Sequence, residues 1–119
     1  MTTQDRLRAA GPSTHQMHVL REIIKERHRQ DAKHGQPPQR RLDGTGPQYK
    51  WRADVSRERT DAAAGRGEET WMQVLTEEFW EAMAEGPLSP ELRHELIQVA
   101  AVCVSWIEDI DRKTGQVPL

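Results

Sequence analysis

Three glutamates stand among large apolar residues in the stretch LTEEFWEAM, residues 75–83. On a helix, Glu77 and Glu78 each lie within one turn of Glu81, so the three side chains are neighbours. Clustered carboxylates repel one another unless a cation offsets their charge. The spacing therefore indicates either a solvated acidic face or a cation site, and this segment alone favours neither.

The position of Glu78 on the helix distinguishes the two interpretations. At about 100° per residue, one apolar stripe is formed by Trp71, Val74, Leu75 and Ala82. Glu78 falls in the middle of this stripe, whereas Glu77 lies about 120° away from it. A solvated acidic face accounts for Glu77 but not for Glu78. A carboxylate on an apolar face needs a partner, and this requirement favours the cation site.

A second pair of oxygen donors lies on the last predicted helix. Glu95 stands at the edge of its apolar face, and Gln98 follows one turn later. Two facing helices that each carry such a pair are a common way for helical bundles to build metal sites. Oxygen ligands favour Mg²⁺, or Mn²⁺, over zinc. We therefore predict that Glu78, Glu81, Glu95 and Gln98 are metal ligands.

A zinc site is less well supported by the sequence. The stretch HELIQ, residues 94–98, is one residue short of the zinc-protease signature HExxH, because Gln98 replaces the second histidine. His94 is therefore interpreted as a surface residue. The single Cys103 lies in an apolar run, which is typical of a core residue. A lone cysteine also predicts a cytoplasmic location, the host cytoplasm if a phage encodes the chain.

The elements that position these side chains are predicted to be helices. Residues 1–12 are expected to form a flexible tail, and residues 13–119 a single helical domain with a Gly- and Pro-rich loop at about 35–52. Four helices are expected at about residues 14–34, 53–64, 68–85 and 90–112, with caps at Ser13 or Thr14 and at Ser89, and with Gly86 just after the third. The predicted fold class is all-α, a small bundle.

Composition restricts the partners of the chain. Its 119 residues carry a net charge of −2, whereas nucleic-acid-binding proteins typically carry an excess of basic residues. The sequence has no apolar run near the roughly 20 residues that cross a bilayer, so no membrane partner is expected. Hydrophobic residues make up only 35% of the chain. We therefore expect a homodimer or homotetramer, in which subunit contacts complete the core.

The acidic pattern resembles a known family. EExxE at residues 77–81, a 13-residue gap and ExxQ at residues 95–98 resemble the MazG-like all-α nucleoside triphosphate pyrophosphohydrolases. The resemblance extends to RQDAKHG (29–35), to TWMQVLTEEFWEA (70–82) and to ELIQVAAVCVSWIEDIDR (95–112), which is similar to phage and actinobacterial members. It covers roughly residues 15–112.

The resemblance implies roles for individual residues. The family motif ExxE maps to Glu78 and Glu81, with Glu77 as the preceding acid, and the motif ExxD maps to Glu95 and Gln98. The family usually has Asp where this chain has Gln98. This difference implies that the site binds fewer ions, that a water takes the place of the missing ligand, or that another acid, Asp31 or Asp61, supplies it. Glu78, Glu81 and Glu95 would bind Mg²⁺, and Glu77 would orient or deprotonate the attacking water.

Four further residues are expected to contact substrate: Asp31, Lys33, Trp51 and Asp61. Asp31 continues the apolar stripe of the first predicted helix, Lys33 flanks the loop, and Trp51 offers an aromatic surface. The family implies hydrolysis of a nucleoside triphosphate, expected to be a deoxyribonucleotide, to a monophosphate and pyrophosphate, in control of the nucleotide pool. Two alternatives stay open: stepwise release of phosphate from tri- and diphosphates, and a non-catalytic helical interaction module.

Overall fold

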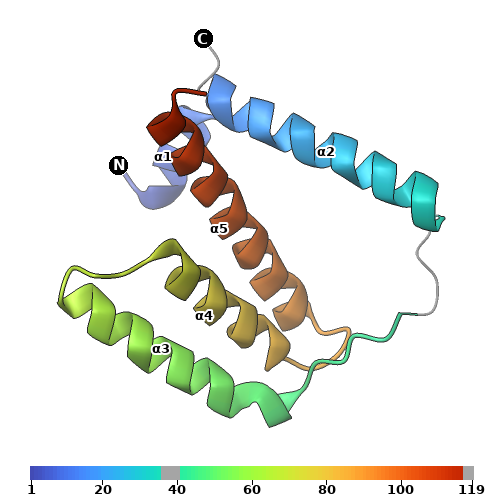
Figure 1. The fold of residues 1–119 in the computed structure, drawn as a ribbon, viewed down its shortest axis with the longest axis vertical. Helices are drawn as coiled ribbons and strands as arrows, with labels where there is room; N and C mark the ends of the chain where they lie inside the picture. The colour runs from blue at the N-terminus through green and yellow to red at the C-terminus, as the bar shows by residue number, and fades with distance from the viewer. Residues whose placement is uncertain (36–40, 117–119) are drawn as a thin grey trace. The chain divides into compact units, whose positions relative to one another are not determined.

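The computed structural model describes residues 1–35 and 41–116 of the chain, and for residues 7–10 it describes the backbone only. These residues form helices and no strand, which confirms the prediction of an all-α fold (Figure 1). The elements in chain order are α1 (Thr3–Ala10), α2 (Thr14–His34), the 3₁₀-helix η1 (Pro47–Tyr49), α3 (Lys50–Gly65), α4 (Trp71–Met83) and α5 (Pro90–Thr114).

The chain divides into two compact units. The first comprises Met1–Gln39 with Ile107–Leu119, and the second comprises Arg40–Trp106, so α5 contributes to both. The single domain predicted over residues 13–119 stays a prediction. Within the described residues, none of the helices combines the length and the apolar character that crossing a membrane requires.

The first unit contains a helix where a flexible tail was predicted. Helix α1 is started by a capping box, in which Thr2 and Asp5 each accept a hydrogen bond from the backbone N–H of the other. It ends at Gly11, whose φ of 59° is in the left-handed region that favours glycine. A local cap therefore stabilises a short helix that the few apolar residues of this segment did not predict, and the flexibility of residues 1–12 stays a prediction.

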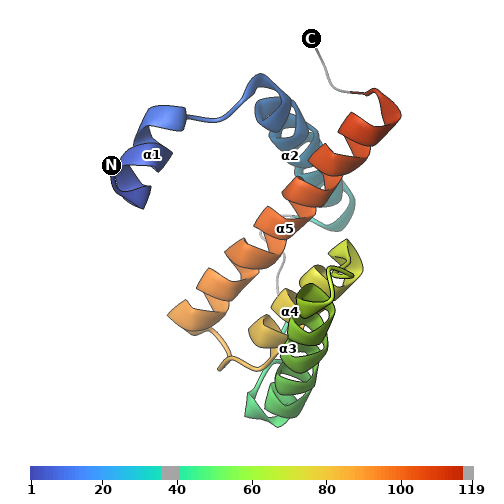
Figure 2. The same ribbon diagram turned by 90° about the vertical axis from the view of Figure 1, so that its left-hand side faces the viewer.

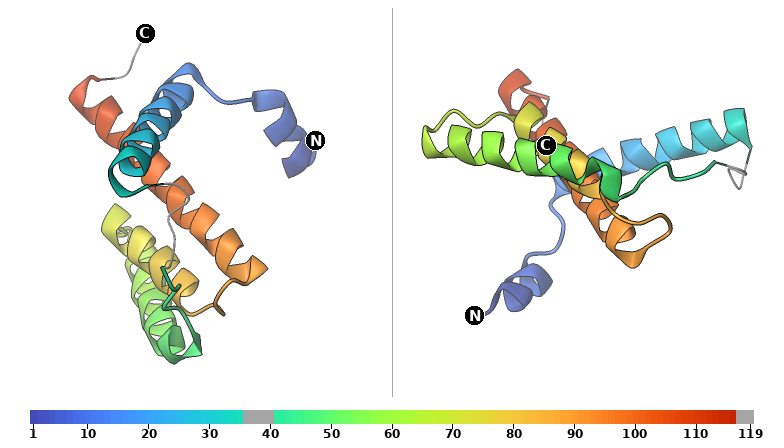
Figure 3. Two further views of the ribbon diagram at one scale, coloured as in Figure 1. Left: turned by 90° about the vertical axis from the view of Figure 1, so that its right-hand side faces the viewer. Right: turned by 90° about the horizontal axis from the view of Figure 1, so that it is seen from below.

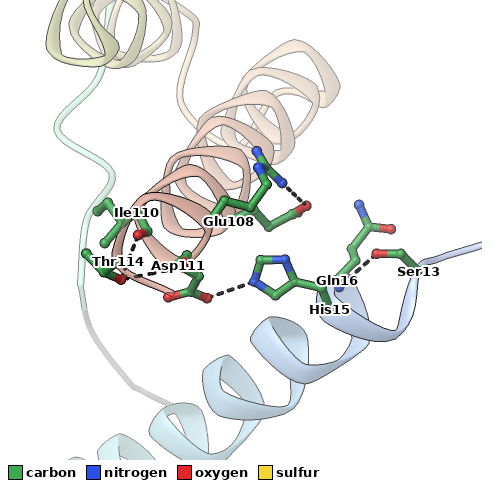
Figure 4. A network of polar contacts seen from close by, with 8 residues as sticks. Ser13, His15, Gln16, Glu108, Ile110, Asp111 and Thr114 are labelled. Carbon is green, nitrogen blue, oxygen red and sulfur yellow. Dashed lines mark hydrogen bonds and ion pairs between the residues drawn. The ribbon is translucent and has the colours of Figure 1, made fainter. Parts of the chain in front are cut away.

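The start of α2 agrees with its sequence. Ser13 is the N-cap, and its hydroxyl accepts a hydrogen bond from the N–H of Gln16 at 3.0 Å. One turn into the helix, Nε2 of His15 lies 2.8 Å from Oδ2 of Asp111 near the end of α5, as Figure 4 shows. Their side chains are only 10% and 15% exposed. This buried polar contact links the two ends of the chain that form the first unit.

The second unit is built on an α3–α4 hairpin. The two helices run antiparallel and side by side in every view (Figures 1, 2 and 3). Ala53, Thr60 and Ala63 are buried on α3, and these small side chains allow the helices to approach closely. The Thr60 hydroxyl donates a hydrogen bond to the carbonyl of Ser56 at 2.8 Å, which satisfies its polar group within α3.

Two helix boundaries differ from the prediction. Helix α3 begins at Lys50 rather than 53, because η1 with Pro47 in its first turn already starts the helical path. The predicted loop therefore ends earlier, and its residues 36–40 lie outside the described part of the chain. Helix α4 spans Trp71–Met83 rather than 68–85, because Thr70 caps its start in a capping box with Gln73.

The turn between α4 and α5 positions the second half of the site. Leu88, not Gly86, takes the left-handed conformation with φ 60°, and its N–H donates to Oδ2 of Asp43 at 2.6 Å. Ser89 caps α5 by accepting from the N–H of Leu92 at 3.0 Å, which confirms the predicted cap. Farther along, the rings of Trp71 and Trp106 stack with centroids 6.4 Å apart. This pair joins α4 to the part of α5 in the second unit.

Candidate metal centre

Three of the predicted ligands come together in the second unit. Glu78 and Glu81 project from one side of α4 because they are one turn apart, and Glu95 comes from the second turn of α5. One carboxylate oxygen from each of the three lies within 4.8 Å of the other two. All three side chains are half-buried. The helix packing therefore gathers three oxygen donors from residues that are up to 17 positions apart in the sequence.

The fourth predicted ligand, Gln98, bridges two of these carboxylates. Carboxylates only accept hydrogen bonds, so the amide nitrogen of Gln98 faces them, and it donates to Oε2 of Glu78 and Oε2 of Glu95, each at 3.0 Å. The amide oxygen then accepts from Nε2 of His94 at 3.0 Å. In this arrangement Gln98 is a donor to the acidic cluster, and its oxygen faces away from the three carboxylates. The structure thus places Gln98 beside two of the predicted ligands, and its role as a metal ligand stays a prediction.

The electrostatics of the cluster favour a bound cation. Burial raises the pKa of Glu78, and the negative charges of Glu81, Glu95 and Glu77 raise it further. The pKa of Glu95 is raised mainly by burial and then by Glu81, against a smaller lowering by His94. For Glu95, burial and the neighbouring carboxylates outweigh the positive charge of Arg57 and the effect of His94. A divalent cation bound between these carboxylates would supply further positive charge.

Two members of the cluster, Glu81 and Glu95, line an open pocket. The pocket has a volume of about 260 Å³, and its charged lining residues are Lys50, Asp54 and Arg57 from α3 together with Glu81, Glu85 and Glu95. Nη2 of Arg57 lies 3.2 Å from Oε1 of Glu81. Carboxylates and two cationic side chains therefore line the same space, and they could provide ligands for a metal ion and for an anion.

The predicted catalytic acid Glu77 lies beside the cluster rather than in it. Its pKa is raised first by burial, then by Glu81 and by Asp61 of α3. The effect of Asp61 places this exposed residue near Glu77, and so near the edge of the site. Arg57 acts in the opposite direction and lowers the pKa of Glu77 slightly.

Three further residues were predicted to contact substrate, one in the second unit and two in the first. Trp51 is 59% exposed, does not line the pocket, and holds the guanidinium of Arg52 at 4.7 Å from its ring centroid. Asp31 and Lys33 belong to the first unit, where Asp31 accepts from Arg27 at 2.7 Å. A role of Asp31, Lys33 or Trp51 in substrate binding stays a prediction.

One residue of the site, Arg57, was not identified from the sequence. A signal was present, because Lys50, Asp54, Arg57 and Asp61 are spaced by four, three and four residues and share one face of α3. This stripe alternates in charge, which is also typical of a solvated helix face. Only the contact with Glu81, 24 residues later, distinguishes Arg57 from a surface arginine.

The donor set fits Mg²⁺ or Mn²⁺. Two oxygens bound to one Mg²⁺ lie at most about 4.2 Å apart, twice the Mg–O distance. The carboxylate oxygens, which lie within 4.8 Å of one another, therefore reach this geometry with small side-chain rotations.

No family model, curated protein or solved structure matches this chain.

Proposed function

We propose that this protein is a Mg²⁺-dependent nucleoside triphosphate pyrophosphohydrolase, with Mn²⁺ as an alternative ion and deoxyribonucleotides as substrates. The observation that carries the proposal is the cluster of Glu78, Glu81 and Glu95, which two helices contribute and of which Glu81 and Glu95 line an open pocket. The resemblance of EExxE and ExxQ to the MazG-like enzymes supports the same assignment. We further propose that the protein acts in the control of nucleotide pools.

Different residues of the chain would bind the ion, position its ligands and accept a proton in this reaction. Glu78, Glu81 and Glu95 hold the ion, and Gln98 keeps Glu78 and Glu95 close together through its two hydrogen bonds. Bound Mg²⁺ would neutralise substrate phosphates and lower the pKa of the attacking water. Glu77, at the edge of the cluster, would accept the proton of that water, and its raised pKa makes it a stronger base than an ordinary glutamate.

A panel of ribo- and deoxyribonucleoside triphosphates tests the proposal. Each is incubated with the protein and Mg²⁺ or Mn²⁺, and mono-, di- and pyrophosphate are separated. We expect monophosphate and pyrophosphate in equal amounts, loss of turnover in EDTA, and no recovery with zinc alone. Diphosphate and phosphate as products would instead identify a stepwise phosphohydrolase. Turnover that persists in EDTA, or no turnover of any nucleotide, would reject the proposal.

A further inference from the structure

Arg57 lies between two carboxylates, one on its own helix and one on α4. Its guanidinium is 3.2 Å from Oε1 of Glu81 and 3.8 Å from Oδ1 of Asp54, one turn earlier on α3. The Arg57 side chain is 52% exposed, whereas that of Glu81 is 22% exposed. The Asp54 side chain is 51% exposed, so Arg57 neutralises the less exposed of its two partners, and Arg57 itself lines the open pocket.

The partner of Arg57 is also a member of the acidic cluster. Glu81 has one carboxylate, and this group both accepts from Arg57 and supplies an oxygen to the set with Glu78 and Glu95. A carboxylate that ligates a divalent cation retains less charge for a guanidinium, and two cations at such short distances repel each other. Arg57 and a divalent cation therefore compete for Glu81.

An arginine released from Glu81 is suited to bind phosphate. The planar guanidinium donates pairs of parallel hydrogen bonds to phosphate oxygens, and Arg forms such contacts more readily than Lys. Lys50 lines the same pocket and adds a second positive charge. Acidic side chains outnumber basic ones in the pocket lining, so a polyphosphate without a divalent cation is repelled.

We infer that Arg57 exchanges partners: it is the counter-ion of Glu81 in the free protein and binds a substrate phosphate once Glu81 is a metal ligand. The inference rests on the proposed function, because it requires a divalent cation at the cluster. It adds an order of binding, in which the cation precedes the polyphosphate. It also makes Arg57 a residue that weakens the binding of the cation while strengthening that of the substrate.

Binding measurements separate these two effects without relying on turnover. The affinity of the protein for Mn²⁺ is measured by electron paramagnetic resonance, and the affinity of the Mn²⁺-loaded protein for inorganic tripolyphosphate is measured by calorimetry. The variants are Arg57→Gln and, as a matched control, Arg59→Gln. Arg59 lies on the same helix and loses the same charge, but it lines a different pocket.

The two variants should behave differently. In Arg57→Gln we expect Mn²⁺ to bind as tightly as in the wild type or more tightly, and tripolyphosphate to bind at least about tenfold more weakly, as for one lost charge-assisted hydrogen bond. In Arg59→Gln both affinities should stay within about twofold, as for an exposed charge. Tripolyphosphate without Mn²⁺ should not bind to any of the three proteins.

Two results would contradict the inference in distinguishable ways. Weaker Mn²⁺ binding in Arg57→Gln, with unchanged affinity for tripolyphosphate, would show that Arg57 only orients Glu81, and the proposed function would still stand. Absence of Mn²⁺ binding to the wild-type protein would reject the proposed function together with the exchange.

Discussion

The amide nitrogen of Gln98 on α5 donates a hydrogen bond to a carboxylate oxygen of Glu78 on α4, across a distance of 3.0 Å. The same nitrogen donates to Glu95 at 3.0 Å. A carboxylate in place of Gln98 could make neither bond, because a carboxylate has no hydrogen to donate at neutral pH. Gln98 thus reduces the repulsion among the carboxylates when no cation is bound, but it provides no negative charge to bind a cation.

The variant Gln98→Glu tests this balance, since it keeps the size of the side chain. Without metal, we expect its free energy of unfolding to fall by about 1–3 kcal/mol, the cost of lost hydrogen bonds to charged groups. With a fourth carboxylate, we expect Mg²⁺ to bind more tightly and to raise the melting temperature more than in the wild type. Thermal unfolding in EDTA and in Mg²⁺ measures both effects. Equal stability of the two metal-free proteins would show that Gln98 does not bridge the carboxylates.

Glu78→Gln separates a functional acid from a structural one. The substitution keeps the shape of the side chain and removes one of the clustered charges, so we expect a large loss of turnover with unchanged or higher thermal stability of the metal-free protein. Mg²⁺ should stabilise the variant less than the wild type. Glu58→Gln, at an exposed position on α3, serves as the control and should retain both turnover and the response to Mg²⁺. Near-normal turnover of Glu78→Gln would remove this helix from the site.

The raised pKa values of Glu77, Glu78 and Glu95 predict the pH dependence of the metal-free protein. A raised pKa means that the folded state binds more protons than the unfolded state at the same pH, so stability falls as pH rises. The window starts at the ordinary glutamate value of 4.5 and ends at the raised values of the folded state. The excess stability of Glu78→Gln over the wild type should therefore grow across this window in EDTA. A difference that does not vary with pH would contradict the assignment.

The buried contact between His15 and Asp111 should stabilise the first unit. Their side chains are 10% and 15% exposed, so Asp111→Ala leaves a buried imidazole without its acceptor. We expect a loss of about 1–3 kcal/mol in urea unfolding. Lys113→Ala is the control, because Lys113 is 73% exposed in its ion pair with Asp109 on the same helix, and it should cost less than about 1 kcal/mol. Equal losses in the two variants would show that burial does not strengthen the His15 contact.

Helix α2 carries apolar side chains that its own chain leaves accessible. Leu20, Ile23 and Ile24 are 37%, 37% and 54% exposed. We expect light scattering to show a homodimer or homotetramer. We expect Ile24→Glu to shift this assembly toward the monomer, because a buried charge weakens an apolar interface. Arg29→Glu introduces an acid on the opposite side of the helix, at a side chain that is 75% exposed, and should leave the assembly unchanged. A monomeric wild-type protein would contradict this prediction.

Local patterns in the sequence determined the helical class and several boundaries. A cap acts within one turn, so Ser13 and Ser89 identified helix starts from nearby residues alone. The spacing of Glu78 and Glu81 likewise places them together on any helix. Helix α1 was missed although Thr2 and Asp5 form a capping box, because a cap without an apolar stripe is a weak signal.

Only the tertiary structure decided how residues from different helices meet. Periodicity gives the angle of a side chain around its own helix, but it does not say which side chain of another helix it faces. The meeting of Glu95 with Glu78, the orientation of the Gln98 amide and the contact of Arg57 with Glu81 depend on how α3, α4 and α5 pack. For the same reason the sequence could not show that Trp51, which was predicted to contact substrate, does not line the pocket. Packing, rather than residue type, assigned these roles.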